Sequence, residues 1–239
     1  MGYQAVFKRY ELKYLLRADQ KERLLALAEP YIALDQYGRT LIRNLYYDTS
    51  DYRLIRRSLE RPIYKEKLRI RSYGNTTPDS PVFLELKKKH NGVVYKRRMV
   101  MPEHQAVSWL EKGEAPQETG QIQQEIDYFC SYYGGLKPQI YLSYQREAYY
   151  CREGEDLRIT FDEDICFRRD RLRLTEAPGG TPLLKENQVL MEIKTSGGIP
   201  LWLTAFLTRE KIYKTSFSKY GIAYQKHILQ EQLGGHLHV

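Results

Sequence analysis

The sequence predicts an α+β protein built on a curved antiparallel sheet or β-barrel, with a charged, basic interior and helices packed against an apolar outer face. Strict alternation over residues 67–71 (KLRIR) places three cations on one face of a strand and two aliphatic side chains on the other. One such strand is ordinary, whereas five or six favour a sheet curved around a charged space. The same arrangement recurs in the segments 83–89, 95–98, 140–148, 157–164 and 189–194.

Length and composition indicate one domain with an anionic partner. The 239 residues are 42% hydrophobic, which suffices for a sizeable core, and no repeat or low-complexity linker divides them. We therefore predict a single domain over residues 1–239. The net charge of +8, from 38 Lys and Arg against 30 Asp and Glu, predicts an anion as the binding partner.

The cysteines and the hydropathy pattern bear on localisation. Cys130, Cys151 and Cys166 are odd in number and lack the spacing of zinc or redox sites, which favours a reducing compartment. Every apolar run is far shorter than the roughly 20 residues that a membrane span needs, and the amino terminus lacks an apolar signal core. We expect a cytoplasmic protein with no membrane segment in this chain.

The first third of the chain predicts a strand, a helix and a second strand. Residues 7–15 alternate charged and apolar side chains, as a half-buried strand does. Residues 18–28 carry leucines at helical spacing, with an aspartate near the start and a proline just past the end. A strand over 42–47 then runs into a polar turn, in which Asp48 or Ser50 can cap a short helix.

The middle third predicts three strands followed by two helices. The strand over 63–73 ends at a Gly-Asn turn. A His-Asn-Gly turn joins the strands 83–89 and 93–101 as a tight hairpin. Apolar stripes at helical spacing predict helices over 103–112 and 119–133.

The last third alternates strands with a loop rich in proline and glycine and ends in helices. The predicted strands cover 140–151, 157–161, 165–174 and 189–195. The predicted helices cover 200–208 and 218–233.

Short motifs follow one another in a recognisable order: E-x-K, Y-Y-D-T-S-D, K-x-R-x-R, E-x-K, Y-x-R, M-E-I-K and S-K-Y. In this order the chain resembles, from about residue 7 to 230, the VTC domain, the catalytic domain of polyphosphate polymerases in the triphosphate tunnel metalloenzyme superfamily. The resemblance implies an antiparallel β-barrel tunnel lined with basic residues. It also implies transfer of the γ-phosphate of ATP to inorganic polyphosphate with a divalent metal, Mn²⁺ or Mg²⁺, and leaves a membrane-associated partner open.

The resemblance also implies roles for individual residues. The residues expected to bind phosphate and support catalysis are Lys13, Arg69, Arg71, Lys87, Lys96, Arg146, Arg158 and Lys219. Those expected beside the substrate are Tyr144, Ser218, Lys214 and Lys67. Glu192 is the expected metal ligand. Arg9 stands where the hydrolase branch carries an additional acid, which moves the match from triphosphatase or cyclase toward polymerase.

The chemistry of phosphoryl transfer agrees with these residue types. Transfer needs positioning and charge neutralisation more than covalent chemistry, and an anionic terminal phosphate needs no strong general base as the acceptor. Arginines suit phosphate because they donate two parallel hydrogen bonds, and a metal held by Glu192 would bridge triphosphate oxygens.

Other interpretations are open for several features. Glu192 could be a structural ion-pair partner of Lys194. The segment 168–173 could be a solvated outer edge of the sheet. Tyr46 and Tyr47 could be packing residues. The alternative functions are those of a tunnel triphosphatase, a nucleotide cyclase, or a non-catalytic protein that binds or senses polyphosphate. Nucleic-acid binding is disfavoured, because RNA modules place aromatic residues beside the cations and here the apolar residues alternate away from them.

Overall fold

The computed structural model describes residues 10–91, 93–116, 120–154 and 156–230. The chain divides into two compact units, each built from three segments. The first consists of Met1–Thr40, Tyr144–Ile165 and Leu184–Phe217, and the second of Leu41–Ser143, Cys166–Leu183 and Ser218–Val239. The single domain expected over residues 1–239 stays a prediction.

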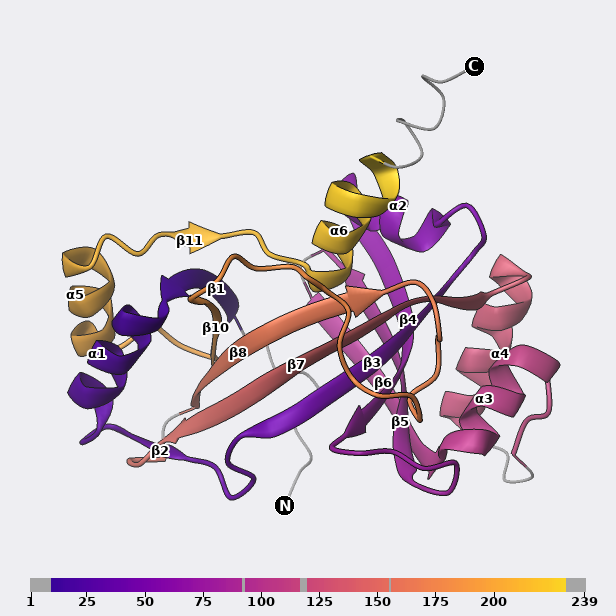
Figure 1. The fold of residues 1–239 in the computed structure, drawn as a ribbon, viewed down its shortest axis with the longest axis horizontal. Helices are drawn as coiled ribbons and strands as arrows, with labels where there is room; N and C mark the ends of the chain where they lie inside the picture. The colour runs from indigo at the N-terminus through magenta and orange to yellow at the C-terminus, as the bar shows by residue number, and fades with distance from the viewer. Residues whose placement is uncertain (1–9, 92, 117–119, 155, 231–239) are drawn as a thin grey trace. The chain divides into compact units, whose positions relative to one another are not determined.

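The first unit is an antiparallel sheet with two helices on one face (Figure 1). Its strand order is β11-β1-β10-β8-β7, and β2 pairs with β7. The strands are β1 (Tyr10–Arg17), β2 (Ile32–Leu34), β7 (Lys137–Cys151), β8 (Leu157–Arg168), β10 (Gln188–Thr195) and β11 (Lys214–Thr215). The helices are α1 (Ala18–Ala28) and α5 (Leu201–Arg209).

The core of the first unit lies between these strands and helices. Alternation sends Leu16 of β1 and Met191 of β10 toward Leu24 of α1 and Phe206 of α5, and all four are buried. The opposite face of the same strands carries the charged side chains. This is the arrangement that the sequence predicts.

The second unit is built in the same way from other strands. Its strand order is β7-β3-β4-β5-β6, and β9 pairs with β8. The further strands are β3 (Thr40–Asp48), β4 (Tyr64–Tyr73), β5 (Pro81–His90), β6 (Val93–Pro102) and β9 (Thr181–Pro182). The helices are α2 (Arg53–Leu59), α3 (Glu103–Lys112), α4 (Gln121–Tyr133) and α6 (Lys219–Ala223), the last continuing as a π-helical turn over Tyr224–Ile228.

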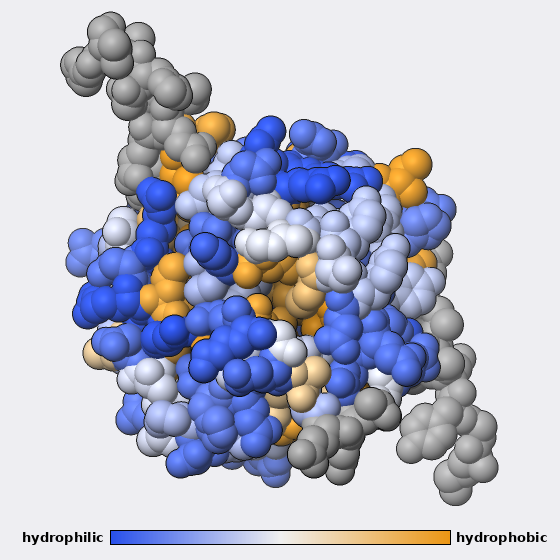
Figure 2. All heavy atoms as spheres, turned by 90° about the vertical axis from the view of Figure 1, so that its right-hand side faces the viewer, coloured by the Kyte–Doolittle hydropathy of each residue, from blue (hydrophilic) through white to orange (hydrophobic). Residues whose placement is uncertain are grey.

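The core of the second unit lies between its strands and the pair α3 and α4 (Figure 1). Leu68 of β4 and Leu84 of β5 are fully buried there with Trp109 of α3 and Phe129 of α4. The Trp109 indole Nε1 donates to Asp127 at 2.8 Å, which ties α3 to α4. The face shown in Figure 2 is mostly hydrophilic, and hydrophobic residues show largely in recesses, as a core on the covered face requires.

Asp48 caps α2, as the sequence predicts for either Asp48 or Ser50. Its carboxylate accepts the backbone N–H groups of Leu54 at 2.8 Å and Ile55 at 3.0 Å. It also accepts the Tyr220 hydroxyl at 2.9 Å. Burial raises the pKa of Asp48 although these donors oppose the rise. One buried carboxyl group therefore fixes both α2 and the beginning of α6.

The structure confirms the α+β class and the antiparallel sheet and corrects three details. The sheet is not strictly closed, because among the described residues β11 and β6 each pair along one edge only. Strand β8 continues through a left-handed residue at Asp164 and ends at Arg168, where a strand is predicted over 165–174. The helix predicted over 218–233 begins at Lys219 and turns π-helical at Tyr224.

Some predictions fall outside the described residues, namely those for residues 7–9, 92, 119 and 231–233. Among the residues that are described, no helix is long and apolar enough to cross a bilayer.

Candidate functional site

The second unit carries rows of cations on three neighbouring strands. The register pairs Lys67 with Lys87 and Lys87 with Lys96 across β4, β5 and β6. Because opposed residues of antiparallel strands share a face, these lysines form one row. The next row holds Arg69, Glu85 and Arg98. We call these residues together with Arg71 the cation ladder; its members are Lys67, Arg69, Arg71, Glu85, Lys87, Lys96 and Arg98.

Glu85 is the centre of the cation ladder. Its side chain is 1% exposed and lies 2.7 Å from both Arg69 Nη2 and Lys96 Nζ. Arg98 Nη2 lies 2.5 Å away and Arg71 Nε 4.0 Å away. Burial alone raises the pKa of Glu85, but Arg69 and Arg71 outweigh it and hold that pKa well below its usual range. The single negative charge of Glu85 thus lies near four positive charges, and the remaining positive charge can bind an anion.

Two further side chains fix the arginines of β4. Arg69 Nη1 donates to the Tyr46 hydroxyl at 2.8 Å, and Arg71 Nε donates to Asn44 Oδ1 at 2.8 Å. Burial alone raises the pKa of Tyr46, but Arg69, Lys67 and Arg71 outweigh it and lower that pKa to about 8. Tyr46 packs on Tyr220, as predicted for a packing residue, and in addition it orients a ladder arginine. Such fixed donors are preorganised for an anion.

The carboxyl-terminal S-K-Y motif lies beside the cation ladder. Lys67 Nζ donates to Ser218 Oγ at 3.0 Å, although 151 residues separate the two. Ser218 also accepts the Gly221 N–H at 3.2 Å and so caps α6, whose first residue is Lys219. Lys214, in contrast, is in β11, where it pairs in register with Tyr14 of the first unit.

The charged face of the first unit centres on Glu192. Its carboxylate is 2.9 Å from Lys194 Nζ and 3.5 Å from Lys13 Nζ, and its side chain is 8% exposed. Burial lowers the pKa of Lys13, but Glu192 and Glu11 outweigh it and raise that pKa. Glu192 therefore lies between two lysine ammonium groups. The ion pair with Lys194 and a role as metal ligand are compatible, because a carboxylate has several acceptor positions.

Arg146 is held by a buried carboxylate on the same face. Its Nε and Nη2 donate to the two oxygens of Asp162 at 2.5 and 2.7 Å, and Asp162 is fully buried. The guanidinium lies 5.2 Å from the centre of the Tyr144 ring. Arg158 lies opposite Lys194 in register, its Nη2 donates to Asp35 at 3.1 Å, and its side chain is 57% exposed. Arg158 therefore lies at the solvated end of the row.

Thr160 adds a polar atom that the sequence does not single out. The residue is 4% exposed and lies opposite Glu192 in register. Among the described residues its hydroxyl has no hydrogen-bond partner. An orphaned hydroxyl beside a carboxylate fits a hydrated divalent cation, which needs only one or two protein carboxylates when phosphate oxygens complete its shell. Glu192 and Thr160 are the residues that would hold it.

The structure brings the predicted residues into two groups, one on each unit. Arg69, Arg71, Lys67, Lys87 and Lys96 share a face with Ser218 nearby, and Lys13, Arg146, Tyr144 and Glu192 lie on neighbouring strands of the first unit. Their convergence on one cavity and their individual roles stay predictions. The partners that sequence reasoning missed are Asn44 and Arg98. Arg98 shares the alternation of Lys96, but its contact with Glu85 depends on a register that only the fold fixes.

The fold and its charged faces define a class of α+β proteins. In this class, one face of an antiparallel sheet carries basic residues around single carboxylates, and helices cover the opposite face of the sheet. Within this class, the chain belongs to the VTC domain family, whose model matches residues 8–228. The resemblance found in the sequence is thereby confirmed.

Several solved structures share the fold, including one from Bacillus halodurans and one from Hippeastrum. A candidate adenylate cyclase from Bacillus halodurans is 16% identical, with 89% of this chain and 94% of that chain covered and a TM-score of 0.53. A candidate adenylyl cyclase from Hippeastrum with a dominant triphosphatase activity is 18% identical, with 89% and 93% covered and a TM-score of 0.50. At these identities the likenesses show a shared fold. A comparison with curated proteins gives no match.

Proposed function

We propose that this chain is a polyphosphate polymerase that transfers the γ-phosphate of ATP to a growing inorganic polyphosphate chain. Its partners are then ATP and polyphosphate, its place is the cytoplasm, and its cofactor is Mn²⁺ or Mg²⁺. Membership of the VTC family supports the reaction class. The cation ladder carries the proposal, because it offers arginine and lysine donors in excess around the one buried carboxylate of Glu85.

The ladder arginines suit the equatorial oxygens of a transferring phosphoryl group. Arg69 is fixed by Tyr46 and Glu85, and Arg71 by Asn44, so neither has to be ordered when the substrate binds. Preorganised donors stabilise charge in the transition state without a reorganisation cost. The lysines of the row, Lys67, Lys87 and Lys96, add charge to neutralise the chain of phosphates.

A divalent cation would be held by Glu192 with Thr160 beside it. When bound, it supplies charge neutralisation across neighbouring phosphate oxygens. Lys13 and Lys194 pair with Glu192 and orient its carboxylate. Two further buried carboxylates, those of Asp162 and Glu85, are engaged by arginines.

These residues fit transfer to a phosphate acceptor better than transfer to an acceptor that a strong base must deprotonate. A terminal phosphate is already a nucleophile at neutral pH, whereas water or a ribose hydroxyl must lose a proton. Transfer to polyphosphate therefore needs positioning and charge neutralisation, which basic side chains provide.

The test is to incubate the purified protein with ATP labelled at the γ-phosphate and Mn²⁺, and to separate polymer, free phosphate and cyclic nucleotide. Polymer that requires both the metal and active protein is the expected product. Free phosphate alone would identify a triphosphatase and cyclic nucleotide a cyclase. Binding of polyphosphate without any product would identify a non-catalytic binding protein.

Matched variants connect the product to the cation ladder. Arg69→Ala should weaken tripolyphosphate binding by more than about 1 kcal/mol, the scale of a charge-assisted hydrogen bond. Arg97→Ala is the control, because Arg97 alternates to the other face of β6 and pairs with Glu125 at 3.0 Å. Equal losses in both variants would remove the ladder from the proposed site.

A further inference from the structure

The loop after β8, residues 169–180, lines a cavity of about 570 Å³ in the second unit. Its charged lining consists of Arg168, Arg169, Arg171 and Asp170, and Gln139 and Thr181 add polar groups. None of the predicted phosphate- or metal-binding residues lines it. The sequence suggests a solvated edge over 168–173, and the structure corrects this for Arg168, which is 5% exposed.

Arg168 organises the loop from inside. Its Nη1 donates to the carbonyl of Ala177 at 2.8 Å, and its Nη2 to the carbonyl of Arg171 at 3.2 Å. The guanidinium carbon lies 3.6 Å from the centre of the Tyr141 ring. Because these carbonyl groups accept hydrogen bonds from Arg168, they are not available for pairing with a neighbouring strand, and β8 ends at Arg168. With its carbonyls so engaged, the loop has a defined path along the cavity.

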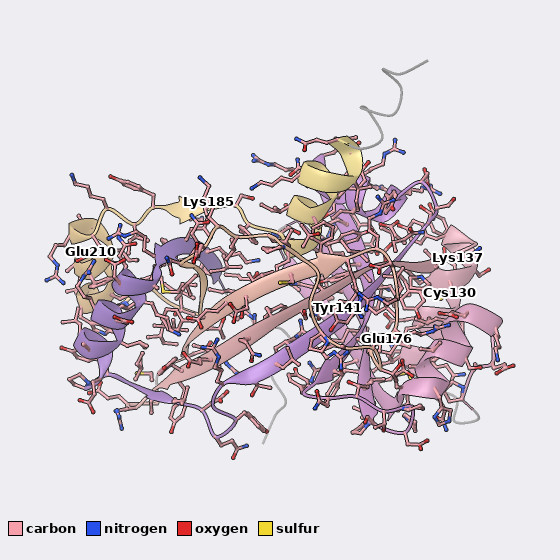
Figure 3. All side chains as sticks on the ribbon, viewed as in Figure 1. Cys130, Lys137, Tyr141, Glu176, Lys185 and Glu210 are labelled. Atoms are coloured by element: carbon pink, nitrogen blue, oxygen red, sulfur yellow. The ribbon has the colours of Figure 1, made fainter. Side chains whose placement is uncertain are left out.

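A second buried arginine and a glycine fix the other end of the loop. Arg43, 2% exposed, donates to the Tyr141 hydroxyl at 2.8 Å and to the backbone carbonyl of Glu176. Figure 3 accordingly shows Tyr141 and Glu176 close together. A Cβ at Gly180 would lie 2.1 Å from the carbonyl oxygen of Phe167, so only glycine permits this approach. The backbone of the loop is therefore preformed, which lowers the cost of ordering it when a ligand binds.

The charge of the cavity is positive. Three arginines and one carboxylate, that of Asp170, line the cavity. The Asp170 carboxylate lies 3.0 Å from Arg171 Nε. The Arg171 side chain is 61% exposed, so solvent and ligands reach it. Phe167 and Tyr52 also line the cavity but are 4% and 5% exposed, which leaves no aromatic face for a nucleotide base. Guanidinium groups in a cavity of this size suit several linked phosphates.

We propose that this cavity, the loop pocket, is a second anion site that binds short inorganic oligophosphates. Arg169 and Arg171 bind the phosphate oxygens, and Arg168 holds the loop that presents them. The loop pocket shares no residue with the cation ladder or with the Glu192 face. Binding there does not depend on the chain being a polymerase.

The experiment is calorimetric titration of tripolyphosphate, without metal, into wild type and two double variants. The pocket variant is Arg169→Gln/Arg171→Asn; asparagine is chosen because residue 171 has a φ of 42°, which Asn tolerates better than most residues. The ladder variant is Arg69→Ala/Lys96→Ala. Wild type should bind two equivalents, and the pocket variant should lose one of them, with at least a tenfold drop in affinity. The ladder variant should retain the pocket equivalent even if the polymerase proposal fails.

Arg57→Gln/Arg209→Gln is the control, because it removes two exposed arginines that do not line the pocket. Circular dichroism establishes equal folding of all variants. A pocket variant with wild-type stoichiometry and affinity, or a control with the same loss, would overturn the second site. ATP should bind the pocket at least tenfold more weakly than tripolyphosphate; equal affinity would overturn the assignment to an inorganic chain.

Discussion

At the scale of single residues, the buried carboxylates among cations are positions where a substitution should have a large effect. Glu85 and Asp162 are 1% and 0% exposed, and each is engaged by arginine. Removing one partner of a buried ion pair costs far more than removing an exposed pair. The consequences for stability and for ligand binding can therefore be separated by substitution.

Glu85→Gln should lower the free energy of unfolding by about 3 kcal/mol, because it leaves the neighbouring cations to repel one another. Tripolyphosphate should restore much of this loss, since it binds the folded state only. Urea unfolding with and without tripolyphosphate measures both effects. Glu125→Gln, at a partly exposed pair with Lys88 and Arg97, should cost less than about 1 kcal/mol. Equal losses for the two variants would contradict the central role of Glu85.

Affinity for tripolyphosphate should fall as the pH rises from 7 to 9. Burial first, and then Arg98 and Arg69, lower the pKa of Lys96 to about 8 against the opposing effect of Glu85. The pKa of Tyr46 is also about 8. Below that pH both groups are protonated; above it the ladder loses a positive charge and gains a negative one. The dissociation constant measured against pH should flatten in Lys96→Met/Tyr46→Phe, and an unchanged slope would refute this origin.

Thr160→Val should act in opposite directions on stability and on metal-dependent binding. The change removes a buried hydroxyl that lacks a partner among the described residues, so the unliganded protein should gain about 1 kcal/mol. If Thr160 contacts the hydrated metal, the same change should weaken the Mn²⁺-dependent part of ATP binding. Thermal unfolding and titrations with and without Mn²⁺ measure the two effects. A loss of stability with unaltered metal dependence would make Thr160 a packing residue.

At the scale of elements, alternation in the sequence predicts most strands and the face that each presents. It succeeds because the period of two is a local property, as in Lys67 to Arg71. It fails after Arg168, where contacts with carbonyls farther along the chain outweigh the local pattern. The sequence places Glu85 and Lys96 on charged faces and predicts that Glu85 pairs with neighbouring cations, but it does not fix which residues are opposed.

The α6 helix offers a test at this scale. Tyr220→Phe removes the hydroxyl that donates to Asp48 and leaves a buried carboxylate with one donor fewer. We expect a loss of about 1 kcal/mol in the free energy of unfolding. Hydrogen exchange should show faster opening of α6, while the strands keep their protection. Uniform acceleration across the second unit would show that Tyr220 supports the whole core instead of α6.

At the scale of the whole molecule, polymer synthesis is the property that tests the metal ligand. Glu192→Gln keeps the shape of the side chain and deletes its charge, so it should largely abolish Mn²⁺-dependent polymer while ATP still binds. In the ion-pair interpretation with Lys194, the variant would lose stability and keep its metal dependence. Polymer formed against Mn²⁺ concentration, at matched folded fractions, decides between them. Superimposable curves would exclude Glu192 as the ligand.

The three-segment construction of each unit has a consequence for biosynthesis. The first unit takes its last segment from Leu184–Phe217, and the second takes its last from residues after Ser218. A ribosome must therefore translate through Phe217 before the first unit has all its parts, and beyond Ser218 before the second unit does. Strand β1 pairs with β10, which lies far along the chain. During synthesis, β1 therefore has no partner in β10 until residues 188–195 have been made. Slowing translation before Leu184 should therefore not help the first unit to fold stepwise, because its last segment has not yet been made.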